Sequence, residues 1–101
     1  MTKVKNQKES KKDEFRKEKE TGHPAYIYAK IGNKFKYIGI THSKITDGVE
    51  NIKLDKNPNP NDIKESYIRP YSQQKSVNKF KKVLIGWFLS KSDKEKIDKL
   101  K

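Results

Sequence analysis

Basic and aromatic side chains alternate through Ser66–Ser92, a stretch that contains no Asp or Glu. Lysine and arginine attract phosphate groups, and exposed aromatic rings stack on unpaired bases with about 1–3 kcal/mol per base. The stretch is therefore a candidate for nucleic-acid binding, through Arg69, Tyr67, Tyr71, Lys75, Lys79, Lys81, Lys82 and Lys91. The alternative is structural: Phe80, Trp87 and Phe88 form the core of a small domain, and the lysines only solvate it.

Two histidines could provide acid and base catalysis. If Gly32-Asn33 is a two-residue turn, His23 and His42 face each other at the open end of a hairpin. Two imidazoles can cleave RNA through its 2′-hydroxyl without a metal ion. Arg69 would then stabilise the phosphorane, and the remaining candidates are Thr41, Ser43 and Lys44. Alternatively both histidines are structural or merely solvated; the spacing indicates no third ligand for a metal site.

The element that would position these groups is a hairpin over Pro24–Thr41, in which β-branched and aromatic residues flank the turn. With a two-residue loop, the register pairs Ala25 with Ile40 and Ile31 with Lys34. Both faces of this hairpin carry apolar side chains, so we expect one face to be core and the other to be covered or used. The hairpin adds three candidate phosphate contacts, Lys30, Lys34 and Lys36.

Two motifs in the hairpin, Tyr26-Ile27-Tyr28 and Tyr37-Ile38-Gly39, are separated by eight residues. This arrangement resembles the opening hairpin of the GIY-YIG nucleases. That family also requires an arginine on the following helix and a later metal-binding glutamate. Because Thr41–Lys53 contains neither an arginine nor a helical pattern, nuclease activity by that route is rejected.

The hairpin is followed directly by Thr41-His42-Ser43-Lys44. A long first hairpin with a Thr/Ser-Lys cluster after it resembles the SH3-like barrel endoribonuclease toxins of the MazF/PemK and type III toxin kind. The resemblance covers about 25 residues. It implies a small closed β-barrel and RNA as a partner, and it carries over Thr41, Ser43 and Lys44 as site residues.

Further strands are expected at Val49–Leu54, Ser66–Arg69 and Val83–Leu89, and a helix is possible around Gln74–Lys82. Ser92-Asp93-Lys94-Glu95 is a capping box that predicts a short C-terminal helix. Because an open sheet of four or five short strands would leave its edges exposed, we expect the strands to curl into a barrel. The predicted fold class is mainly β (α+β), a small, partly open SH3-like barrel.

The charge of the chain is unevenly distributed. Its 101 residues carry a net charge of +12, with 38% charged and 31% hydrophobic residues. Residues 1–20 contain almost no apolar side chains, so we interpret them as a charged arm, disordered or helical. Residues 21–92 have ordinary globular composition and form the β-rich domain, and residues 93–101 form the C-terminal helix.

Strong basicity favours a polyanionic partner, DNA or RNA. The leading hypothesis is therefore a small nucleic-acid-binding protein of a phage, plasmid or other mobile element, which contacts mainly the phosphate backbone. The alternatives are a metal-independent, toxin-like endoribonuclease and a phage-type inhibitor of a host nucleic-acid-binding protein. No cofactor is expected. The absence of cysteine and of any apolar span predicts a cytoplasmic protein without membrane contact.

Overall fold

Three antiparallel strands form the centre of the fold: β1 (Glu9–Glu18), β2 (Pro24–Ile31) and β3 (Lys34–Thr41). The structure is a computed structural model and describes residues 8–101. The other elements are β4 (Ile45–Thr46), β5 (Val49–Glu50), β6 (Ile52–Lys53), β7 (Tyr67–Ile68), β8 (Gln73–Ser76), the 3-10 helix η1 (Val77–Lys79), β9 (Phe80–Val83) and α1 (Lys91–Asp98). No helix in the described part of the chain is both long and apolar enough to cross a membrane.

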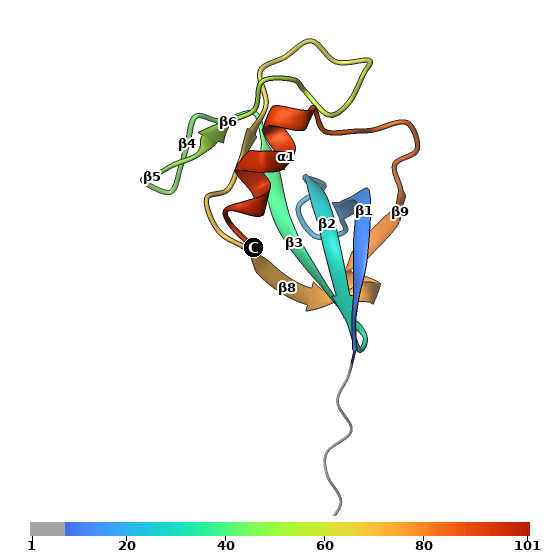
Figure 1. Cartoon of the computed structure of the whole chain (residues 1–101). Coiled ribbons are helices and arrows are strands. Elements are labelled where there is room, and N and C mark those ends of the chain that lie inside the picture. The colour runs from blue at the N-terminus through green and yellow to red at the C-terminus, as the bar shows by residue number, and fades with distance from the viewer. Residues whose placement is uncertain (1–7) are drawn as a thin grey trace, which may run out of the picture.

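The sheet curls because its two edges are joined by a short connection. The strand order is β6-β7-β3-β2-β1-β9, and β8 pairs with the first half of β3. The turn η1 then carries the chain from β8, beside β3, to β9, beside β1 (Figure 1). This arrangement gives the partly open barrel that was expected of a small mainly β domain, with one short helix at its C-terminal end.

The strand β1 corrects the expectation that residues 1–20 form an arm. Glu9–Glu18 pairs with β2 along its length and with β9 near its end, and the Phe15 side chain is only 2% exposed. One apolar residue is sufficient here because neighbouring strands satisfy the backbone and Glu14 pairs with Arg16 at 2.7 Å. The first seven residues of the expected arm lie outside the described residues.

The central hairpin has two registers. Near the Gly32-Asn33 turn, Ile31 pairs with Lys34 as predicted. From Ile27 back to Ala25, each residue pairs with a partner one position earlier than predicted. Ala25 therefore pairs with Gly39 and not with Ile40. A bulge between Ile27 and Ala29 causes this shift. The predicted opposition of His23 and His42, which depends on the unshifted register, is consequently wrong.

Both faces of the central sheet are covered. One core contains Phe15, Tyr26, Ile38 and Ile97 of α1, and Trp87 packs against it partly buried. Helix α1 lies against this side of the sheet (Figure 1). The second core lies inside the curl of the sheet: Ala25, Ile27, Phe35, Tyr37 and Phe80. The structural interpretation is thus confirmed for Phe80 and Trp87, whereas Phe88 is 50% exposed.

Several local predictions differ from the structure. The helix considered at Gln74–Lys82 is β8, η1 and β9, and most of the strand expected at Val83–Leu89 is irregular. Helix α1 begins earlier than the predicted capping box, because Ser90 and not Ser92 accepts the hydrogen bond from the Asp93 N–H. The Asp93 carboxylate instead accepts the backbone N–H groups of Asp55 and Lys56, at 2.7 and 3.0 Å. These bonds anchor α1 to the chain that follows β6.

Candidate functional site

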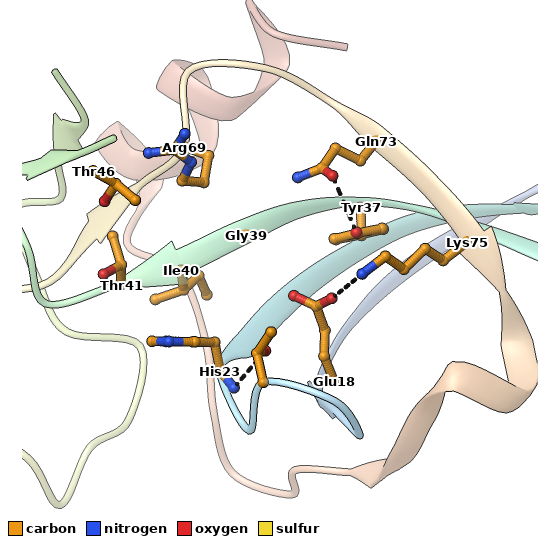
Figure 2. Close-up of a pocket in the computed structure, with 11 residues that line it drawn as sticks. Glu18, His23, Tyr37, Gly39, Ile40, Thr41, Thr46, Arg69, Gln73 and Lys75 are labelled. Carbon is orange, nitrogen blue, oxygen red and sulfur yellow. Dashed lines mark hydrogen bonds and ion pairs between the residues drawn. The ribbon is translucent and has the colours of Figure 1, made fainter. Parts of the chain in front are cut away.

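A cavity of about 240 Å³ lies over the second half of β3. Strand β3 runs beneath it, between Arg69 and Gln73 on one side and Glu18 and His23 on the other (Figure 2). Arg69 follows β7 directly and Gln73 begins β8, and the end of β1 with the following turn supplies Glu18 and His23. The curl of the sheet therefore brings together residues far apart in the sequence.

Arg69 forms one wall of the cavity. Its backbone N–H bonds to the Gly39 carbonyl at 2.9 Å, and its side chain passes over Gly39, where an added Cβ would lie 3.2 Å from the Arg69 Cγ. The guanidinium donates to Asn51 Oδ1 at 2.7 Å and to the Tyr71 hydroxyl, at 3.1 Å from Nε and 2.7 Å from Nη2. All these partners are neutral, so they fix the position of the guanidinium without neutralising its charge.

Lys75, another predicted contact, also lines the cavity but is ion-paired. Its ammonium lies 2.7 Å from a carboxylate oxygen of Glu18, and this hydrogen bond raises the pKa of Lys75. The neighbouring Tyr37 is buried, which raises the pKa of its hydroxyl, and it donates to Gln73 Oε1 at 3.3 Å. Lys75 and Glu18 together add no net charge to the cavity.

The structure brings together only part of the predicted catalytic set. His23, Thr41 and Arg69 line the cavity. His42 is directed elsewhere: its Nδ1 lies 2.9 Å from the Glu65 carbonyl oxygen, and its Nε2 is 3.6 Å from Asp62. Ser43 and Lys44 are exposed outside the cavity lining. The pair of imidazoles that RNA cleavage was expected to use is therefore not assembled.

Five exposed lysines lie on or directly beside the segment where β1 and β9 pair. We call them the β1–β9 lysine cluster: Lys17, Lys19, Lys79, Lys81 and Lys82. The Lys19 N–H donates to the Lys79 carbonyl at 2.9 Å, and Arg16 donates to the Lys81 carbonyl at 3.2 Å. None of the five ammonium groups has a carboxylate within 4 Å among residues 8–101.

The cluster and the cavity share the end of β1. Glu18 lines the cavity between Lys17 and Lys19 in the sequence, and because side chains alternate along a strand, Lys17 lies on the opposite face of β1 from Glu18. Sequence reasoning missed these two lysines because it placed them in a charged arm, disordered or helical, and no alternation of apolar and polar residues marks a strand there. It also missed Asn51 and Gly39, which position Arg69, because no sequence pattern connects them to it.

The other predicted contacts are dispersed. Lys36 is ion-paired with Glu9, Lys30 and Lys34 lie near the hairpin turn, and Lys91 opens α1. Tyr71 is 42% exposed beside Arg69, so it remains available for contact.

Tyr67 is not available in the same way. It is buried and donates to Glu65 at 3.1 Å, and burial together with this bond raises the pKa of its hydroxyl.

Comparison of the chain with family models, with curated proteins and with solved structures gives no match. The structure thus offers two candidate binding features: the β1–β9 lysine cluster and the small cavity over β3.

Proposed function

We propose that this protein binds nucleic acid and holds the phosphate backbone with the β1–β9 lysine cluster. The observation that carries the proposal is that five exposed lysines lie on or directly beside the paired strands β1 and β9, and none of their ammonium groups has a carboxylate within 4 Å among the described residues. Uncompensated cations at this density attract a polyanion and bind it with release of counterions.

The distribution of ion pairs supports this choice of surface. Six lysines elsewhere are neutralised by a carboxylate, as Lys53 is by Glu65 at 3.0 Å and Lys94 by Asp13 at 3.1 Å. Other lysines of the described chain have no ion pair, but several of them, Lys44, Lys56 and Lys64, lie in separate loops, whereas the five of the β1–β9 lysine cluster lie at one strand pair. Lysine presents a point charge and not the bidentate fork of arginine, so we expect contacts to phosphates and little base recognition. A cytoplasmic, mobile-element setting belongs to the same proposal.

The test compares two triple variants of equal charge. Lys79→Ala, Lys81→Ala and Lys82→Ala together remove cluster lysines, whereas Lys53→Ala, Lys94→Ala and Lys101→Ala remove lysines that are ion-paired. We expect the first variant to weaken binding of a fluorescent oligonucleotide at least about tenfold at ~50 mM salt, and the second to have a much smaller effect. Equal losses would show that only net charge matters, and absence of binding by the unmodified protein would refute the proposal.

A second candidate function, metal-independent RNA cleavage, is favoured by one observation: His23, Thr41 and Arg69 share a cavity. His23 would accept the proton of a 2′-hydroxyl, and Arg69 would stabilise the phosphorane. Cleavage in the presence of EDTA should then be lost in His23→Ala and retained in His42→Ala, because His42 lies outside the cavity. Binding without any cleavage would leave only the binding function.

A further inference from the structure

The guanidinium of Arg69 is partly buried and has no counter-charge. Of its five N–H donors, three bond to Asn51 and Tyr71, which leaves one on Nη1 and one on Nη2. No carboxylate of the described chain lies within 4 Å of it. Since a partly buried charge is costly unless it is paired, an arginine held this way is complementary to an anion from outside.

The groups around Arg69 hold it rigidly. The amide of Asn51 donates to the Ser43 carbonyl at 3.0 Å and to Thr46 Oγ1 at 2.8 Å, which turns its Oδ1 toward the guanidinium. The absence of a side chain on Gly39 leaves room for the arginine. Such support from a second layer of contacts is typical of a preorganised binding site.

The cavity also offers hydroxyl donors beside Arg69. Thr46 Oγ1 already accepts the bond from Asn51, and Thr41 Oγ1 accepts the Ser43 N–H at 3.1 Å. Both threonines line the cavity, and each hydroxyl keeps its own hydrogen for donation. Two guanidinium N–H groups and two hydroxyls are the donor types that bind phosphate oxygens.

We infer that this cavity is a phosphate pocket that takes the terminal phosphate monoester of a nucleotide. The inference rests on the proposed function and deepens it, because the nucleotide is the end of a strand whose backbone lies on the β1–β9 lysine cluster. A volume of about 240 Å³ is below that of pockets for drug-sized ligands, about 300–1,000 Å³, and is enough for one phosphate group. A phosphate monoester carries more negative charge than an internal diester, which suits an arginine without a counter-charge.

The experiment uses one single-stranded oligonucleotide with a 5′-phosphate, a 3′-phosphate or neither. We expect the strand with one of these phosphates to bind about tenfold more tightly than the unphosphorylated strand, the gain of about one charge-assisted contact. In Arg69→Gln, the ratio of the two affinities, phosphorylated over unphosphorylated strand, should fall to about one. Arg16→Gln is the matched control and should preserve it, because Arg16 is neutralised by Glu14. Thermal melting checks that each variant is folded.

Glu18→Gln keeps the inference falsifiable if Arg69→Gln does not fold. Removing this carboxylate leaves Lys75 unpaired at the cavity, so the ratio between phosphorylated and unphosphorylated strands should increase. A ratio of one in the unmodified protein, or a ratio unchanged by both variants, would overturn the pocket while leaving the lysine cluster intact. If no strand binds, the proposed function fails, and 5′-AMP and 3′-AMP test the pocket alone through the NMR signals of His23 and the Arg69 Nε.

Discussion

Asp93 is the clearest case of a single side chain that holds two elements together. Its carboxylate is fully buried and accepts the N–H groups of Asp55 and Lys56, which would otherwise lack partners. We expect Asp93→Ala to lower the free energy of unfolding by about 3 kcal/mol, because it removes two bonds to a charged acceptor. Chemical denaturation measures this. Asp98→Ala, an exposed acidic residue of the same helix, should cost less than about 0.5 kcal/mol.

Tyr26 predicts how stability changes at alkaline pH. The side chain is 1% exposed, and burial together with its bond to Asp13 raises the pKa of its hydroxyl well above the ordinary value. A raised pKa in the folded state means that the stabilisation is complete below about pH 10 and is lost as the pH rises through the folded value. Melting temperature should therefore fall above about pH 10, and less steeply in Tyr26→Phe. An identical alkaline slope in both proteins would contradict this assignment.

At the scale of elements, β1 is the strand on which both the fold and the proposed surface depend. Phe15 packs against Tyr26 and Trp87, with ring centroids 5.1 and 5.7 Å apart. Phe15→Ala should cost about 3–5 kcal/mol in chemical denaturation, as expected for a buried phenylalanine. Phe88→Ala is the matched control and should cost less than about 1 kcal/mol, because that ring is half exposed. Equal losses of stability in the two variants would contradict the claim that residues 9–18 are a strand packed on the core.

The elements that could be predicted from sequence are those with local determinants. Gly32-Asn33 specifies the turn, and the hairpin pairs as predicted next to it. The bulge between Ile27 and Ala29 could not be predicted, because no turn residue or break in the apolar pattern marks it in the sequence. Strand β1 was missed because much of what holds its charged residues comes from distant segments: β9 pairs with its end, and Lys75 pairs with Glu18.

The candidate site shows the same division. Arg69 and Lys75 stand in a stretch whose composition indicates nucleic-acid binding, and the structure places both at the cavity. The predicted histidine pair depended on a register that the bulge changes, so only His23 lines the cavity. Glu18, Asn51 and Thr46 complete the surroundings through contacts across the fold that no local pattern encodes.

For the whole molecule, the central claim is that uncompensated lysines bind phosphates, and salt tests it most directly. Binding through five lysines predicts a slope of log affinity against log salt between about −3.5 and −4.5, for single strands and duplexes respectively. Removing Lys79, Lys81 and Lys82 should bring this slope closer to zero by about 2.1 for single strands and about 2.7 for duplexes, with little change in the variant of Lys53, Lys94 and Lys101. An affinity that does not depend on salt, or a slope that both variants change equally, would contradict the account.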